Sequence, residues 1–124
     1  MSRTVLMLRK AALAAGGACL LAVIWLSWIP KEWEVRTSLA GQIEHVVAYA
    51  GTAAVLALGL PRLSAWHLFV ALVALAGVLE IGQRWIPGRT AQAIDFAASS
   101  LGAGLGTLAG IVVLRVLLRR DRTS

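Results

Sequence analysis

Four stretches without charged residues alternate with short polar segments along the chain, at residues 11–30, 46–61, 63–79 and 96–114. A helix needs about 20 mostly apolar residues to cross a bilayer, and lipid offers no partners for open backbone groups. With their flanks, the stretches predict four transmembrane helices, at about residues 11–30, 43–61, 64–86 and 92–118. The predicted fold class is an all-α membrane protein, a single domain over residues 1–124 folded as an antiparallel four-helix bundle.

The connections between the predicted helices are short and carry turn signals. Residues 61–64 read Pro-Arg-Leu-Ser, which predicts a tight turn with Ser64 as the N-cap of the third helix. Pro87-Gly88 breaks the chain before the fourth helix, and Thr90 is in position to cap that helix.

Composition supports the membrane assignment. Hydrophobic residues make up 59% of the chain and charged residues only 15%, so polar surface is too scarce to cover a soluble domain and lipid must cover much of the exterior. The net charge of +6 comes from basic residues at the segment ends, where lipid headgroups lie, which argues against nucleic acid as a partner. The single cysteine, Cys19, cannot form an internal disulfide and is interpreted as a small packing residue.

The basic residues fall unequally on the two sides of the predicted bundle. One side carries Arg3, Arg9, Lys10, Arg62, Arg115, Arg119, Arg120 and Arg122. The other side carries Lys31, Arg36, Arg84 and Arg89. Because cytoplasmic loops are enriched in Lys and Arg, eight against four predicts that both the N-terminus and the C-terminus are cytoplasmic.

Polar residues gather at the predicted outer ends of three helices. They are spaced three or four apart, so each set shares one helix face: His45 and Tyr49, then Glu80, Gln83 and Arg84, then Asp95 and Ser99, with Arg89 in the loop between the last two sets. A buried carboxylate needs a partner or a proton, so we expect Glu80 to pair with Arg84, Arg89 or His45. The three sets are predicted to converge on one outer pocket.

Simpler interpretations remain open for each residue. His45 or Tyr49 alone is more often an interfacial residue, and Glu80 with Arg84 is equally compatible with a structural ion pair. Gly102, Gly106 and Gly110 form a small-residue stripe that is typical of close helix packing, within the chain or in a homo-oligomer.

The order of the polar residues resembles the VanZ-like membrane protein family. Its pattern is a His and a Tyr four apart, then Glu-x-x-Gln, a Pro-Gly-Arg turn, and an Asp followed by an Asn and a Gly. The corresponding residues here are His45, Tyr49, Glu80, Gln83, Pro87, Gly88, Arg89, Asp95 and Gly102. Two positions depart from the pattern: Ser99 replaces the Asn, and Gly41-Gln42 replaces the Asp-Lys that often precedes the His.

The resemblance implies a protein of the bacterial cytoplasmic membrane, in a family named after a protein associated with low-level resistance to teicoplanin, a lipoglycopeptide. The favoured hypothesis is a protein that binds an amphipathic envelope molecule at the outer leaflet, either a lipid-linked glycan precursor or a lipoglycopeptide. In this hypothesis Arg84 and Arg89 contact phosphate or carboxylate, and Trp33 and Trp85 pack on the apolar part or on sugar.

Two alternatives come from other function classes. One is a membrane-embedded enzyme that uses His45, Glu80 and Asp95 as acid–base groups. The other is a small oligomeric transporter, although spans one and two carry no mid-membrane charge for an ion relay. No cofactor or metal is expected, because the sequence has no HxxxH or HExxH spacing.

Overall fold

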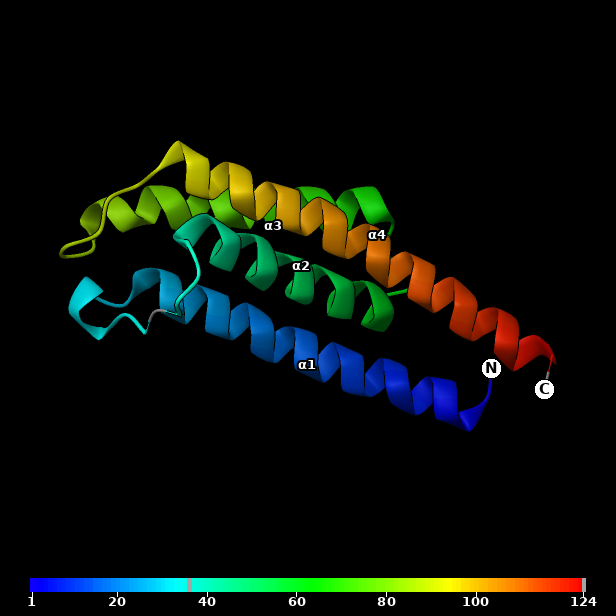
Figure 1. The fold of residues 1–124 in the computed structure, drawn as a ribbon. Helices are drawn as coiled ribbons and strands as arrows, with labels where there is room; N and C mark the ends of the chain where they lie inside the picture. The colour runs from blue at the N-terminus through cyan, green and yellow to red at the C-terminus, as the bar shows by residue number, and fades with distance from the viewer. Residues whose placement is uncertain (36, 124) are drawn as a thin grey trace.

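The computed structural model describes residues 1–35 and 37–123, and it is helical throughout, with no strand in these residues. The helices, shown in Figure 1, are α1 (Arg3–Trp28), α2 (Gly41–Gly59), α3 (Ala65–Gly82) and α4 (Ala93–Thr123), with two short 3₁₀ helices, η1 (Lys31–Trp33) and η2 (Gln83–Trp85). The predicted all-α class is therefore confirmed. Arg36, counted above among the outer basic residues, lies outside the described residues.

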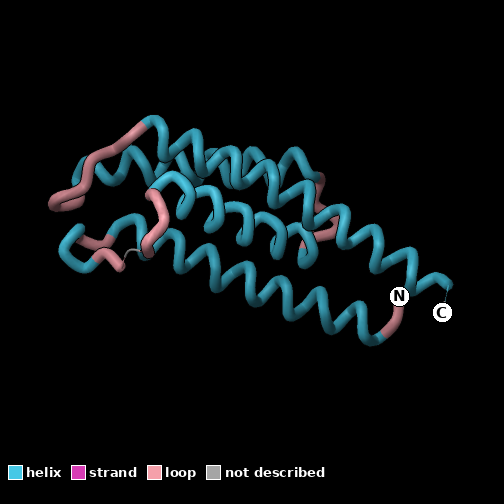
Figure 2. The backbone as a smooth tube through the Cα atoms, viewed as in Figure 1, coloured by secondary structure: helices cyan, strands magenta, loops and turns pink. Residues whose placement is uncertain are grey.

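The four helices lie side by side, and consecutive helices run in opposite directions (Figure 1). The longer connections, which contain η1 and η2, gather at one end of the molecule (Figure 2). The turn at residues 60–64 lies toward the opposite end, and α1 and α4 continue past it to the two termini. There the backbone N–H of Ser2 donates to Asp121 Oδ2 at 2.8 Å, which holds the start of α1 against the end of α4. We call the end with η1 and η2 the loop end.

Three of the helical segments are long and apolar enough to cross a membrane: Arg3–Trp28, Ala65–Trp85 and Ala93–Thr123. Helix α2 is not among them. Its first turns carry Gln42, Glu44 and His45, and its buried face carries Tyr49 and Thr52. These polar groups lower its hydropathy, and its position explains how they are accommodated, because α2 packs most extensively against α4 and next against α1.

The glycine stripe of α4 forms the contact with α2. Gly102 lies against Val46 and Gly106 against Ala50, so closely that a Cβ at either glycine would collide with a backbone carbonyl oxygen of α2. A Cβ at Gly110 would lie 2.5 Å from the carbonyl oxygen of Ala54. The close approach predicted for this stripe thus occurs within one chain, and a homo-oligomer contact through the same glycines would have to displace α2.

One of the two predicted helix caps is confirmed. The Ser64 hydroxyl accepts a hydrogen bond from the backbone N–H of His67 at 3.3 Å, as expected of an N-cap. Thr90 does not occupy the cap position of α4, because that helix begins only at Ala93. The backbone N–H groups of Asp95 and Phe96 instead donate to the carbonyl of Gln92.

Candidate ligand-binding site

The turn before α4 positions the site. The backbone N–H of Arg89 donates to the carbonyl of Ile86 at 3.1 Å, and Gly88 has φ +74°, which together indicate a type II turn with Pro87 and Gly88 at its centre. A side chain other than hydrogen would be strained at Gly88. The Pro87 carbonyl accepts the N–H of Lys31 at 3.3 Å, so the turn rests on η1.

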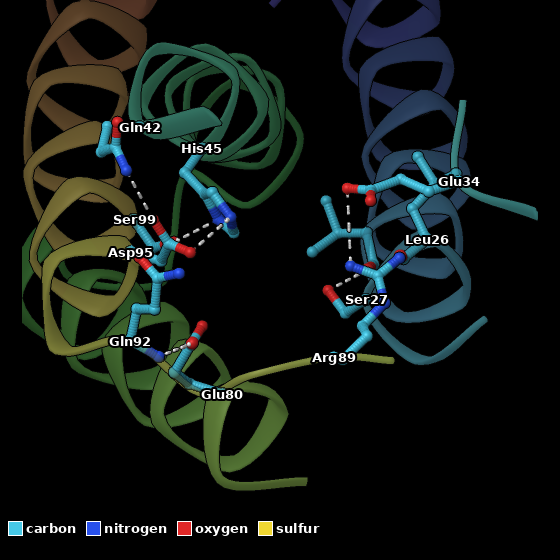
Figure 3. A network of polar contacts seen from close by, with 11 residues as sticks. Leu26, Ser27, Glu34, Gln42, His45, Glu80, Arg89, Gln92, Asp95 and Ser99 are labelled. Carbon is cyan, nitrogen blue, oxygen red and sulfur yellow. Dashed lines mark hydrogen bonds and ion pairs between the residues drawn. The ribbon is translucent and has the colours of Figure 1, made fainter. Parts of the chain in front are cut away.

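Arg89 closes the C-terminal end of α1 (Figure 3). Its Nε donates to the carbonyl of Ile29 and its Nη2 to the carbonyl of Leu26, both at 2.8 Å. Its Nη1 lies 3.7 Å from Glu34 Oε1. The carbonyls in the last turn of a helix lack partners within the helix, and a cation is favoured there. Arg89 therefore joins the loop end of α1 to the turn that leads into α4.

A second polar group joins α2 to the first turns of α4, across from Arg89 in Figure 3. His45 Nδ1 lies 3.1 Å from Ser99 Oγ, and His45 Nε2 lies 3.8 Å from Asp95 Oδ2. Gln42 donates from Nε2 to the other oxygen of Asp95 at 3.3 Å. Tyr49 lies one turn deeper on α2, only 4% exposed, where its hydroxyl interacts with Ser99. The predicted proximity of His45, Asp95 and Ser99 is thus observed.

Glu80 has a different partner from those expected. It is 8% exposed, and its Oε1 accepts the backbone N–H of Gln92 at 2.6 Å. Within residues 1–35 and 37–123, no ion pair joins Glu80 to Arg84, Arg89 or His45. The carboxylate instead lies at the N-terminal end of α4, where the backbone carries partial positive charge. Glu80 therefore fixes the start of α4, which also carries Asp95.

A polar cavity of about 250 Å³ lies between these two groups at the loop end. Its described lining consists of Lys31, Glu34, Gly41, Gln42, Glu44, His45, Gln83, Gly88, Arg89, Thr90, Gln92 and Asp95. We refer to it as the polar cavity. Its residues come from α2, from α4 and from both connections, so the whole loop end contributes to one hollow.

A second cavity of about 220 Å³ adjoins the first and is more apolar. It is lined by Val23, Leu26, Ser27, Glu34, Val35, Thr37, Glu44, His45, Ala48, Tyr49, Gln83 and Arg89. We refer to it as the apolar cavity. Glu34, Glu44, His45, Gln83 and Arg89 line both cavities. The two cavities therefore share part of their lining, and the apolar cavity lies between α1 and α2.

The predicted site residues divide between these cavities and their surroundings. His45, Gln83, Arg89 and Asp95 line the polar cavity, and Tyr49 lines the apolar one. The remaining predicted residues lie elsewhere: Ser99 is buried beneath His45, and Glu80 and Arg84 line a separate hollow of about 300 Å³ between α3 and α4. Trp33 and Trp85 are exposed and are absent from the described lining of either cavity.

Several lining residues were not predicted from the sequence. Gln42 lies three residues before His45, and Gln92 lies three residues before Asp95, so helical spacing could have placed both on the same faces. Glu34 and Lys31 carried no such signal. They reach the cavity because η1 folds back onto the Pro87-Gly88 turn.

The contacts from Ser99 to His45 and from His45 to Asp95 resemble those of a nucleophile with a base and an orienting acid. Ser99 is only 2% exposed, however, and it is not among the described residues that line either cavity. A substrate in these cavities would not reach its hydroxyl, so the arrangement is better suited to holding α2 and α4 in register. No group of three or more His, Cys, Asp or Glu side chains suited to a metal ion occurs among the described residues.

In comparisons with known proteins, no family model matches this sequence, and no curated protein or solved structure matches it either. The similarity to the VanZ-like family therefore rests on the motif residues alone and stays a prediction.

Proposed function

We propose that this chain is a VanZ-like integral membrane protein of the bacterial cell envelope, which binds an amphipathic molecule at the outer leaflet of the cytoplasmic membrane. The ligand would be a lipid-linked glycan precursor or a lipoglycopeptide such as teicoplanin. In this proposal all four helices cross the membrane as an antiparallel bundle, and both termini are cytoplasmic.

The dimensions and charges of the helices support this arrangement. The exposed Trp66 and Trp85 lie at opposite ends of the α3–η2 segment, separated by roughly 28 Å at the rise of an α-helix, close to the thickness of the hydrocarbon layer. Tryptophan is enriched at both membrane interfaces. Helix α2 has 19 residues, enough for a similar depth, and its packing between α1 and α4 shelters its polar side chains.

The observation that carries the binding proposal is the junction of the two cavities. The polar cavity offers amide, carboxylate and imidazole groups, and the adjoining apolar cavity offers Val23, Leu26 and Ala48 between α1 and α2. An amphipathic molecule places unlike groups in unlike surroundings, so one ligand with a polar head and an apolar chain would occupy both hollows. A purely polar or a purely apolar molecule would use only half of the site.

The test is to block the apolar cavity and measure ligand binding. Ala48 lines this cavity and its neighbour Val47 does not, while both residues are exposed. We expect purified protein in nanodiscs to bind teicoplanin, Ala48→Trp to weaken binding at least tenfold, and Val47→Trp to leave it unchanged. A glycopeptide without the acyl chain should bind more weakly than teicoplanin. The proposal would be contradicted if the affinity for the glycopeptide changed neither with Ala48→Trp nor with removal of the acyl chain.

A further inference from the structure

Arg89, the arginine that lines both cavities, already has partners. Arg89 uses Nε and Nη2 on the carbonyls of Ile29 and Leu26 and faces Glu34 with Nη1. A phosphate group is recognised by guanidinium donors that are free to point at it. Its Nε–Nη2 edge is thus held by the end of α1, and the Nη1 edge, which faces Glu34, is the part left for a ligand. A phosphate on that edge would compete with the Glu34 carboxylate.

The remaining charges around the polar cavity also disfavour an anion. The described lining contains three carboxylates, Glu34, Glu44 and Asp95, against two cations, Arg89 and Lys31. Asp95 is held by Gln42 and His45, and Glu44 accepts hydrogen bonds from the N–H and hydroxyl of Thr37. An added negative group would meet like charge on several sides, with only the exposed Lys31 not already engaged by a carboxylate.

Gln83 provides an independent observation. The residue is 5% exposed and lines both cavities, and its side chain makes no hydrogen bond to any described residue. The amide atoms of Gln83 are not fully enclosed but open to the cavities, so they are available to a group bound there. An amide both donates and accepts, as a hydroxyl group does. The group that would satisfy Gln83 at the junction of the cavities is therefore one that can do both.

We propose that the polar cavity takes an uncharged, hydroxyl-rich head group, such as a sugar, and that the Gln83 amide binds this head group where it meets the apolar chain. This inference rests on the proposed function and narrows its ligand class, because it removes precursors whose glycan is joined to the lipid through phosphate. The neighbouring amides of Gln42 and Gln92 and the imidazole of His45 supply further donors and acceptors for hydroxyl groups.

The experiment compares three lipids with identical acyl chains: a glucosyl-diacylglycerol, a phosphatidic acid and the bare diacylglycerol. Binding to the full chain is measured by native mass spectrometry in a polyoxyethylene detergent, which carries no sugar. We expect the glucosyl lipid to bind at least tenfold more tightly than the other two. Gln83→Leu should weaken its binding about threefold to tenfold, the worth of one or two hydrogen bonds.

Arg84 supplies the matched control. It is adjacent to Gln83, is exposed and is not among the described residues that line either cavity. Arg84→Leu should leave glucosyl-lipid binding unchanged. If Gln83→Leu fails to fold, Gln83→Glu keeps the side-chain shape, removes the amide donor and should still weaken glucosyl-lipid binding.

The outcomes separate the two proposals. If phosphatidic acid binds more tightly than the glucosyl lipid and Ala48→Trp abolishes its binding, the amphipathic site stands and the head-group inference is wrong. If the glucosyl lipid binds but neither Gln83 variant weakens it, the role of Gln83 is wrong. If no lipid responds to Gln83→Leu or to Ala48→Trp, the head-group inference and the proposed function both fail.

Discussion

Gly106→Ala should destabilise the protein, because the added Cβ would force α2 and α4 apart. The new Cβ would collide with the carbonyl oxygen of Ala50 and would lie 2.7 Å from the Ala50 Cα and carbonyl carbon. Ordinary contact distances begin near 3.4 Å, so the two backbones would have to separate by at least 0.7 Å (3.4 − 2.7), and by more to clear the carbonyl oxygen. Because Gly102 and Gly110 pack on the same face, this separation loosens their contacts too. We expect a loss of about 1–3 kcal/mol, as for other overpacked interiors.

The control is Gly51→Ala on α2, since a Cβ at Gly51 has no neighbouring atom within 4 Å. That change should be neutral or stabilising by up to about 1 kcal/mol, because alanine favours helix over glycine. Gly59 would be a poor control, because a Cβ there would lie 2.8 Å from the backbone of Leu13. Reversible unfolding in mixed SDS micelles, followed by tryptophan fluorescence, gives the free energies. Equal stability of the Gly106 and Gly51 variants would refute the reasoning.

A rescue experiment distinguishes backbone from side-chain collisions. The collision at Gly106 involves the backbone of Ala50, so Ala50→Gly should not restore stability. A Cβ at Gly16 would instead meet the side chain of Leu56, with Cδ2 at 2.5 Å. The loss caused by Gly16→Ala should therefore shrink when it is measured in a Leu56→Ala background. Rescue of Gly106→Ala by Ala50→Gly would show that the two helices are not in backbone contact at this point.

Three further predictions address the loop end and the topology. Glu80→Gln should lower the unfolding free energy by about 1–3 kcal/mol, because the backbone N–H of Gln92 loses a charged acceptor, and unchanged stability would show that this bond contributes nothing. Gly88→Ala should cost about 1–2 kcal/mol by the same unfolding assay, because φ is +74°, and a neutral result would mean that the turn can change type. Reporter fusions after Arg62 should read cytoplasmic and those after Trp33 external, and the reverse pattern would overturn the proposed orientation.

The hydrophobic pattern predicted the helices but not their ends. Residues 11–30 were predicted as the first span, whereas α1 begins at Arg3, and α4 continues to Thr123, beyond the predicted end at residue 118. The pattern marks the part of a helix that suits hydrocarbon, and charged residues such as Arg9 are good helix formers that extend the helix beyond that part. The glycine stripe predicted a close neighbour. That this neighbour is α2 was shown only by the structure, although Val46, Ala50 and Ala54 of α2 repeat at the same spacing as the glycines.

The sequence predicted which residue types gather at the loop end. It predicted less well which partners these residues have. His45, Asp95 and Ser99 meet as their helical spacing suggested. Arg89 and Glu80 do not pair with each other, because each is engaged with backbone groups at a helix end. A pattern of side chains contains no record of backbone carbonyl and N–H groups, so such partners cannot be read from charge spacing alone. The three-dimensional path of the connections decides them.

The shelter that α4 gives to α2 has a consequence for biosynthesis. α2 leaves the ribosome before α4, so in the proposed four-span topology its polar turns would enter the membrane without the helix that later covers them. In that topology α1, which also packs against α2, would be the neighbour available to α2 until α4 arrives. Chains truncated before α4 should consequently fail to retain α2 in the bilayer and should be degraded by membrane quality-control proteases.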